Sequence, residues 1–252
     1  MTIGAPVSPD VRCIVTCVIA ASWIALALLA IEPAPGGLPS ASSPPCPATS
    51  FAGSAAFLVV GKISGKARDA IAAAQRARAN KLEATVVRGG LFEGTGKGTL
   101  VVYGAFAREA DAAARVAALA KKKIAAAALW SGKPASAAPL VRVCGDARRE
   151  GEGLELPARD PRFSHVPVAV RVGASRYHTE TDATGYFELW LAGGGKAELF
   201  VPAFKPETRD AGNLCGYTGS GDDVREPVDL PAAPGGSVRA PSLAQTITHC
   251  GE

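Results

Sequence analysis

The pattern of hydrophobic and polar positions changes twice along the chain. Residues 13–31 (CIVTCVIAASWIALALLAI) contain no charged side chain. Between residues 57 and 130, short Leu/Val runs are followed by segments whose alanines recur every three or four positions, which predicts strands followed by amphipathic helices. From residue 140 onward, short alternating runs lie between Gly, Pro and Asp, which predicts strands alone. The chain is therefore expected to be an α+β protein with an apolar N-terminal helix.

The apolar stretch 13–31 is long enough to span a membrane. Nineteen residues at ~1.5 Å per helical residue just cross a hydrocarbon core of ~30 Å. Arg12 precedes the stretch and Glu32 follows it, so residues 1–12 are expected in the cytoplasm and the remainder outside. The alternative is a signal peptide, whose apolar core is usually ~7–15 residues and whose cleavage would release a secreted protein. We expect a signal anchor in the inner membrane, with the bulk of the chain in the periplasm.

Residues 57–130 contain an internal repeat with an offset of 43 residues. Each copy opens with a Leu/Val strand that ends in glycine, continues with a helix and closes with a short strand, at 82–88 in the first copy and 124–130 in the second. The helical positions that match are Ala67, Ala70, Ala74 and Ala77 in the first copy, and Ala110, Ala113, Ala117 and Ala120 in the second. This order predicts a split β-α-β (ferredoxin-like) domain, with two helices on one face of a four-stranded antiparallel sheet.

The other face of that sheet is the candidate binding surface. Because side chains alternate along a strand, one set of residues is expected beneath the helices and the other set on the open face. The residues expected on the open face are Phe57, Val59, Leu100 and Val102, and those expected beneath the helices are Leu58, Val60, Val101 and Tyr103. An open face built from apolar side chains is one that a domain either covers or uses.

The two strand ends, V-V-G-K-I and V-V-Y-G-A-F, each before a helix and beyond a membrane span, resemble the SPOR domain. The resemblance covers residues 57–130. It implies binding of peptidoglycan, with a preference for glycan strands stripped of stem peptides, through the open face of the sheet. Phe57 matches the aromatic residue that often opens the first strand of such domains. Val59 and Val102 stand where those domains often carry Gln and Arg.

Residues 140–252 predict a β-sandwich, joined to the preceding domain by a linker at 131–139. A Pro/Gly/Ser-rich linker, 32–56, is expected before the first domain. Candidate strands lie at 140–144, 166–172, 176–181, 185–191, 196–201, 224–230 and 245–249. The segment T-D-A-T-G-Y-F at 181–187 resembles the T-D-x-x-G-x-F hairpin of carboxypeptidase regulatory-like domains, which are transthyretin-type sandwiches without catalysis of their own. Asp182 is expected to bond backbone amides in the turn, Gly185 to supply a positive φ, and Phe187 to enter the core.

Charge and cysteines fit an exported chain with two different parts. Residues 57–130 carry 13 Lys/Arg against 5 Asp/Glu, a net +8, whereas residues 140–252 carry 12 against 16, a net −4. Outside the apolar stretch lie Cys46, Cys144, Cys215 and Cys250, which allow three pairings. In an oxidising compartment disulfides are expected, and we predict a bond between Cys215 and Cys250.

Neither catalysis nor a cofactor is predicted. His165, His178 and His249 do not stand at metal-ligand spacing, and Asp222-Asp223 is interpreted as a solvated loop pair rather than a calcium site. The loop 94–99 (GTGKGT) resembles a phosphate loop, but Gly98 follows Lys97 where Ser or Thr is required, so a hairpin loop is expected. An RNA-recognition fold shares this topology, but it needs aromatics on two central strands to stack bases and is expected inside the cell, so nucleic-acid binding is not predicted.

The sequence therefore predicts a non-catalytic cell-envelope protein that binds peptidoglycan. The alternative is a membrane-anchored protein that interacts with another envelope protein. Its apolar sheet face would then pack on that partner or on its own sandwich.

Overall fold

The computed structural model describes residues 45–61, 65–151, 164–204 and 221–247. The predicted membrane span, residues 13–31, lies outside these ranges, and so does the predicted disulfide between Cys215 and Cys250. Within these ranges, no helix is both long and apolar enough to cross a bilayer. The described residues form one compact unit, so the two expected domains are described below as its subdomains.

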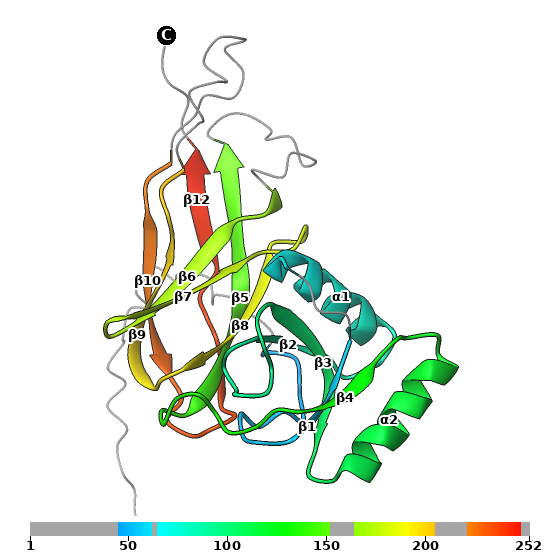
Figure 1. Ribbon diagram of the computed structural model, residues 1–252. Coiled ribbons are helices and arrows are strands. Elements are labelled where there is room, and N and C mark those ends of the chain that lie inside the picture. Colours follow the sequence, from blue (N-terminus) through cyan, green and yellow to red (C-terminus); the bar gives the residue numbers. More distant parts are fainter. Residues whose placement is uncertain (1–44, 62–64, 152–163, 205–220, 248–252) are drawn as a thin grey trace, which may run out of the picture. The chain divides into compact units, whose positions relative to one another are not determined.

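The first subdomain has the element order β-α-β-β-α-β that the repeat predicts (Figure 1). Its elements are β1 (Phe57–Val60), α1 (Ala67–Ala79), β2 (Thr85–Arg88), β3 (Thr99–Phe106), α2 (Glu109–Lys121) and β4 (Ala127–Trp130). The sheet order is β2-β3-β1-β4 and every pairing is antiparallel. Residues 89–98 form the predicted hairpin loop between β2 and β3. We call this part the split βαβ subdomain.

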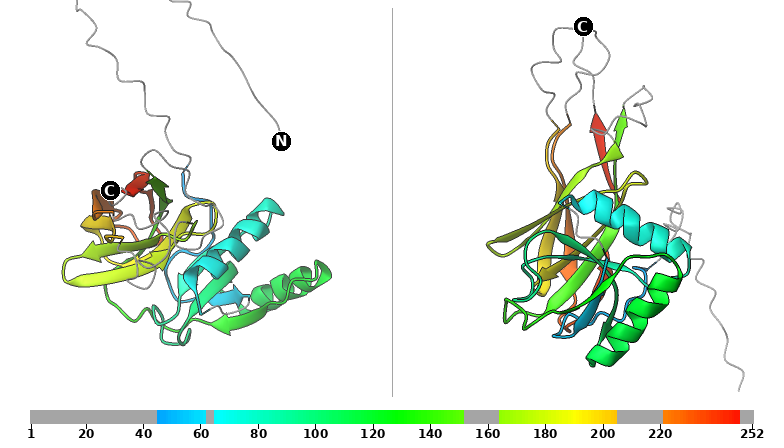
Figure 2. Two further views of the ribbon diagram at one scale, coloured as in Figure 1. Left: turned by 90° about the horizontal axis from the view of Figure 1, so that it is seen from above. Right: turned by 45° about the vertical axis from the view of Figure 1, so that its right-hand side comes forward.

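Small apolar residues hold both helices on one face of that sheet (Figure 2). In α1 the buried positions are Ala70, Ile71, Ala74 and Ala77, and in α2 they are Ala112 and Leu119. The stripe predicted for the second helix was wrong, because the buried positions of α2 match those of α1 at an offset one residue shorter than the repeat; the exposed alanines are Ala110, Ala113, Ala117 and Ala120. The two helices also end alike, each with a lysine in the left-handed conformation followed by an apolar residue whose amide bonds back into the last turn. The repeat is therefore visible in the helix ends as well as in the order of elements.

The second subdomain is a two-layered β-sandwich. Its strands are β5 (Leu140–Gly151), β6 (Pro167–Val172), β7 (Ser175–Glu180), β8 (Tyr186–Ala192), β9 (Gly195–Val201), β10 (Val224–Leu230), β11 (Ser237–Arg239) and β12 (Leu243–Ile247). One sheet has the order β10-β9-β6-β7; in the other, β5 pairs with β8 on one edge and with β11 and then β12 on the opposite edge. Alternate side chains of both sheets, including Val143, Val170, Phe187 and Leu199, form the core between them. The seven predicted strands are present. The eighth strand, β11, was not predicted, because its three residues are too few to show an alternating pattern.

The turn at 182–185 carries the chain from one sheet of the sandwich to the other. Asp182 Oδ1 accepts hydrogen bonds from the Thr184 amide at 2.8 Å and from the Tyr186 amide at 3.2 Å. Gly185 has a φ of +86°, a conformation that disfavours other residues, and Phe187 is fully buried. These are the arrangements expected for these positions from the sequence.

Strand β8 is buried on both faces, because it is shared by the sandwich core and by the contact between subdomains. Phe187, Leu189 and Leu191 face the sandwich core. Glu188 and Trp190 alternate with them and lie toward the split βαβ subdomain. The alternate positions of β8, which the sequence pattern would assign to solvent, therefore form the interface with the split βαβ subdomain.

Glu188 is the central side chain of that interface, and the residue is 1% exposed. Its carboxylate accepts hydrogen bonds from the Thr85 hydroxyl and, at 3.1 Å, from the Val86 amide. It pairs with the guanidinium of Arg78 on α1 and lies 3.6 Å from that of Arg142 on β5. A carboxylate from the sandwich thus satisfies an edge amide of β2 and balances two buried cations.

Two aromatic side chains complete this polar cluster. The Tyr186 hydroxyl donates a hydrogen bond to Glu188 at 3.2 Å, and the Trp190 indole N–H donates one to the Thr85 hydroxyl at 2.9 Å. Burial, reinforced by the Glu188 carboxylate, raises the pKa of Tyr186 above its ordinary value, so the hydroxyl remains a donor at neutral pH.

A disulfide joins Cys46, at the start of the described chain, to Cys144 in β5, across 98 residues of sequence. The Pro47 carbonyl beside it accepts a hydrogen bond from Arg142 at 2.5 Å, and Phe51 is 1% exposed. Residues 46–51, expected to belong to a linker, are thus part of the folded unit.

Replacing Glu188 by Gln should destabilise the fold strongly, because the guanidinium groups of Arg78 and Arg142 would lose their buried counter-charge. The expected cost is about 3–5 kcal/mol in the free energy of unfolding. The matched control is Glu198→Gln, which removes a carboxylate from partly exposed ion pairs and should cost about 0–1 kcal/mol. Urea unfolding followed by tryptophan fluorescence measures both. Equal midpoints for the two variants would show that the Glu188 cluster does not hold the subdomains together.

Losing the Cys46–Cys144 bond should lower the free energy of unfolding by about 4–5 kcal/mol, because a loop of about 100 residues is released in the unfolded chain. The double variant Cys46→Ser/Cys144→Ser, compared with reduced and oxidised wild type, measures this. Peptide mapping without reductant identifies the pairing directly. A Cys46 peptide joined to Cys215 or Cys250 instead would contradict the structure.

Candidate functional site

The four residues predicted to share an open sheet face do not share a face. In β1 and β3, Val60 is directly opposite Val102, with a bulge in the register between Leu58 and Val60. Directly opposite residues point to the same side of a sheet, so Leu100 and Val102 share their face with Leu58 and Val60. Phe57 and Val59 belong instead to the cluster under the helices. The predicted grouping was wrong because the two strands were aligned by the internal repeat, which ignores the bulge.

The face opposite the helices is also not open. Leu100 and Val102 are 0% and 1% exposed, and Val59 beneath the helices is 0% exposed. The face is covered by four side chains from the preceding segment, the β2–β3 loop and the sandwich, namely Phe51, Phe92, Leu140 and Trp190. The expected ligand-binding surface is therefore buried, and the sheet face packs on the chain's own sandwich. A ligand would have to separate the subdomains to reach it.

Docking of the two subdomains creates a cleft of about 190 Å³ at their junction. Val86 and Arg88 line it from the end of β2, and Thr99 lines it from the start of β3. His178 and Glu180 line it from β7, with the start of α1 and part of β8 closing the remaining walls. The cleft thus combines charged groups of both subdomains with apolar wall atoms, which is the composition of small-ligand sites.

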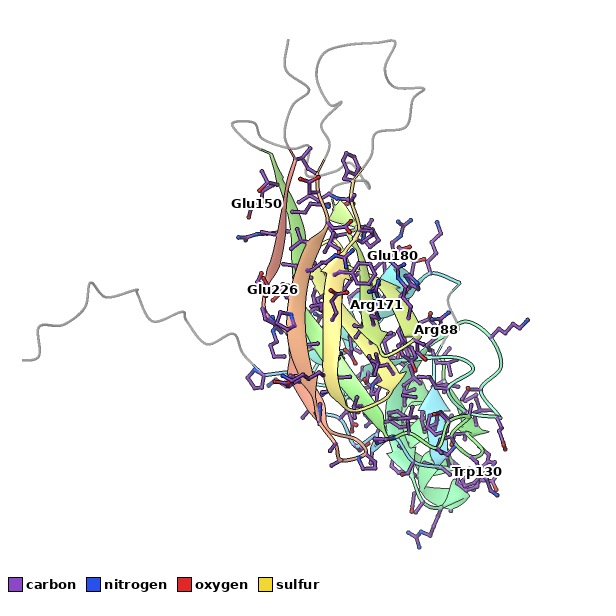
Figure 3. The ribbon with its side chains drawn as sticks, turned by 90° about the vertical axis from the view of Figure 1, so that its left-hand side faces the viewer. Arg88, Trp130, Glu150, Arg171, Glu180 and Glu226 are labelled. Atoms are coloured by element: carbon purple, nitrogen blue, oxygen red, sulfur yellow. A yellow bond between two sulfur atoms is a disulfide. The ribbon has the colours of Figure 1, made fainter. Side chains whose placement is uncertain are left out.

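The cleft opens onto a cationic face on the outer side of the β10-β9-β6-β7 sheet. We define this face by Arg88, Arg171, Arg176, His178 and Arg225. Figure 3 shows Arg88, Arg171 and Glu180 near one another on this flank, and Trp130 at the far end of the split βαβ subdomain. Desolvation, together with the charges of Arg176 and Arg88, lowers the pKa of His178. Positive potential therefore accumulates where the face meets the cleft.

A buried aromatic ring supports the arginines of this face. The Phe200 ring is 2% exposed, and the Arg176 guanidinium lies 4.2 Å from its centroid, with those of Arg171 and Arg225 at 5.8 Å. Glu198 pairs with Arg171 and Arg225, each at 3.4 Å. Among the described residues, no carboxylate pairs with Arg88 or Arg176.

Glu180 is the acidic group of the cleft. Its Oε2 atom is buried, lies 3.7 Å from Arg68 and makes no hydrogen bond to any described residue. Glu180 therefore adds one negative charge to the β7 wall of the cleft, beside His178, and Arg68 lies within ion-pair distance of it.

Other side chains singled out by the sequence make local contacts. His165 Nδ1 lies 3.1 Å from the Thr181 carbonyl oxygen. Asp223 accepts a hydrogen bond from the Ala203 amide and pairs with Arg225, and the Arg225 hydrogen bond is the main cause of its lowered pKa. In the described parts of the chain, no three His, Cys, Asp or Glu side chains converge as metal ligands. His249 and Cys250 lie outside the described residues.

The sequence contained a signal for part of this site. In β7 the order Arg176-Tyr177-His178-Thr179-Glu180 alternates charged with uncharged residues, so three titratable groups were predictable on one face. The position of Arg88 beside these residues could not be predicted from the sequence, because Arg88 belongs to β2 of the other subdomain.

Comparison with known proteins gives no match: no family model fits the chain, and no curated protein or solved structure is significantly similar to it.

Proposed function

We propose that this protein is a non-catalytic component of the cell envelope, anchored in the inner membrane by residues 13–31, that binds peptidoglycan through its cationic face. The described part would lie outside the cytoplasm. The contact with the wall would use the cationic face and the adjoining cleft, because the sheet face first expected to bind glycan is buried.

The disulfide supports an extracytoplasmic location. Disulfides persist in oxidising compartments such as the periplasm and are rare in the cytosol. Cys46 and Cys144 lie close enough to be bonded although they are 98 residues apart, and both are at least partly buried. The charge-free stretch before Cys46 supplies a plausible means of export.

The observation that carries the binding proposal is the pair Arg88 and Arg176, which are exposed and have no carboxylate partner among the described residues. Guanidinium groups make paired hydrogen bonds to carboxylates, and clustered cations attract a polyanion over long range. Glycan strands with free lactyl carboxylates present such charges at regular intervals. A rigid base, formed by Phe200 and Glu198, keeps the face ordered before the ligand arrives.

The observed topology also supports, for each subdomain, the family resemblance that its sequence suggests. The strand order β2-β3-β1-β4 with two helices on one face is compatible with a SPOR-like domain. The Asp182-Gly185 turn between the layers of a sandwich is compatible with a carboxypeptidase regulatory-like module. In this proposal the sandwich is more than a spacer, because it covers the glycan-binding face of the SPOR-like domain and contributes the cationic face.

Removing the two unpaired arginines should abolish most wall binding. We expect Arg88→Ser/Arg176→Ser to reduce the fraction of full-length protein that sediments with purified sacculi by about tenfold, since a hydrogen bond to a charged group contributes about 1.5–3 kcal/mol. Binding of the wild type should also weaken as salt is raised, because exposed charges are screened.

The control for this experiment is Lys121→Ser/Lys122→Ser, which removes the same charge from the exposed end of α2. Wild-type binding is expected in that variant. Equal loss in both variants would mean that net charge alone drives sedimentation, and no loss in either would refute binding through the cationic face.

A second function, recognition of another envelope protein, is favoured by the edge of the split βαβ subdomain. Trp130 is 49% exposed, the only large apolar side chain among the described residues that is exposed. Trp130 ends β4, an edge strand whose four residues carry no charge, and its ring packs against that of Phe57 in β1 with the ring centroids 4.8 Å apart. Apolar edge strands without charged residues are sites for strand addition by another chain.

Site-specific photocrosslinking in cells tests this alternative. A probe at Ala128, on the exposed edge, should give a specific adduct with an envelope protein, whereas a probe at Lys97, on the exposed hairpin loop, should not. Trp130→Ser should remove the adduct while sacculus binding is unchanged. Absence of an adduct at Ala128, or its persistence in Trp130→Ser, would exclude the β4 edge as the interface.

A further inference from the structure

Strand β4 is an unpaired edge of the split βαβ sheet. The sheet order ends at β4, and no strand in the described ranges pairs with its outer side. The Ser131 amide donates a hydrogen bond to the Ala56 carbonyl at 2.9 Å, just beyond the β1–β4 pairing. Because backbone groups of an antiparallel pair point alternately toward and away from the neighbouring strand, the amides and carbonyls of Ala128 and Trp130 point outward, away from β1.

These outward groups are complementary to themselves. A two-fold axis beside β4 would bring the β4 strands of two copies together in antiparallel orientation. Ala128 of one copy would then lie opposite Trp130 of the other, and the two such pairs would exchange four hydrogen bonds. Every outward donor and acceptor of β4 would be used. Each bulky indole would also lie beside the methyl group of an alanine, on the face of the sheet that carries the helices, since Trp130 packs there against Phe57.

The exposed apolar surface continues from this edge onto α2. Arg115 donates a hydrogen bond to the Tyr103 carbonyl at 3.2 Å, so the Arg115 flank of α2 faces β3. A helix turns about 100° per residue, so Ala113 and Ala117 lie on the opposite flank. That flank faces β4, because the sheet order is β3-β1-β4, and both alanines are exposed. They belong to the predicted alanine stripe that α2 does not bury.

The charges on α2 favour a second copy of the same chain as the partner. Glu109 lies at the start of the helix, Lys121 and Lys122 lie at its end, and all three are exposed. The two-fold axis that pairs the strands also makes the two α2 helices antiparallel. The acidic start of one helix then faces the basic end of the other, and complementary charge favours the correct pairing. Attachment of both copies to one membrane would raise their effective concentration.

We propose that two copies of this protein associate through β4 and α2, with the β4 strands joined into one continuous sheet and both Trp130 rings buried between the two α2 helices. This rests on the second function proposed above, because it uses the same edge, and it names the partner as the protein itself. Figure 3 shows Trp130 well apart from Arg88 and Arg171, so the cationic face stays free in the pair.

Analytical ultracentrifugation of the full-length protein in detergent tests the association directly. The wild type should sediment as a reversible dimer. Ala128→Pro should weaken the association by about tenfold or more, because each copy loses one outward amide donor. The fold should be retained, since proline is tolerated where an edge amide faces solvent, and the urea midpoint checks this. A wild type that stays monomeric at its highest soluble concentration, or a folded Ala128→Pro that associates normally, would overturn the proposal.

A charge on α2 gives a second test that leaves the strand unchanged. Ala117→Lys places like charges on the two facing flanks and should weaken the dimer by about tenfold or more. The matched control is Ala118→Lys, which adds the same charge at an exposed position on the Arg115 flank and should associate as the wild type does. Equal dissociation constants for the two variants would show that this flank of α2 is not at the interface, and would overturn the proposal.

The photocrosslinking experiment separates this proposal from the function on which it rests. With the probe at Ala128, an adduct that contains two copies of the protein supports self-association. An adduct that contains only another envelope protein would retain the second function and refute the dimer. Dimerisation without sedimentation on sacculi would refute wall binding alone and leave self-association in place.

Discussion

The structure depends on one buried carboxylate. The Glu188 side chain extends from β8 of the sandwich toward the split βαβ subdomain. Its carboxylate contacts Arg78 of α1, Arg142 of β5 and the Val86 amide on the edge strand β2. Burying three ionised groups costs several kcal/mol per ion unless their pairing is nearly complete. Apolar contact between the subdomains, as around Trp190, is not directional, whereas the hydrogen bonds of Glu188 to Arg78, Thr85 and Val86 require one relative position, even though Arg78 Nη1 and two nitrogens of Arg142 have no hydrogen-bond partner among the described residues. The ion cluster therefore sets the register between the two halves of the protein.

That register decides which surfaces remain for function. Because the sandwich covers the face with Leu100 and Val102, this side of the split βαβ sheet is not open to solvent. The same docking brings Arg88 beside His178 and forms the cleft, which neither subdomain has by itself. A change at Glu188 is thus expected to act on the site at a distance, by loosening the contact between its two walls.

Much of the fold was predictable from the sequence, because periodicity reports directly on local structure. Both helices, the hairpin loop at 94–99 and seven sandwich strands lie where the pattern placed them, but only the alanine stripe of α1 is buried; the one predicted for α2 is exposed. Contacts between residues far apart in the sequence were not predictable. In β8, Glu188 and Trp190 have the alternation of a half-exposed strand, and nothing local distinguishes a solvent face from an interface. The bulge in β3, where Tyr103 and Gly104 stand opposite one residue of β1, changed which residues share a face. Cys46 lies in a proline-rich stretch whose sequence gave no sign of packing. The same limit applies to the candidate site, since its groups come from β2 and β7.

The Cys46–Cys144 bond has a mechanical consequence for a tethered protein. Any tension that arrives through the chain before Cys46 passes through the two sulfur atoms into the middle of β5. This strand is hydrogen-bonded to β8 on one edge and to β11 and β12 on the other, so the force is distributed over three neighbours as shear. The helices and strands between residues 57 and 130 lie outside that load path. Under the proposed function, a pull transmitted to Arg176 would therefore bypass the backbone of residues 57–130, whereas a pull transmitted to Arg88 would load β2.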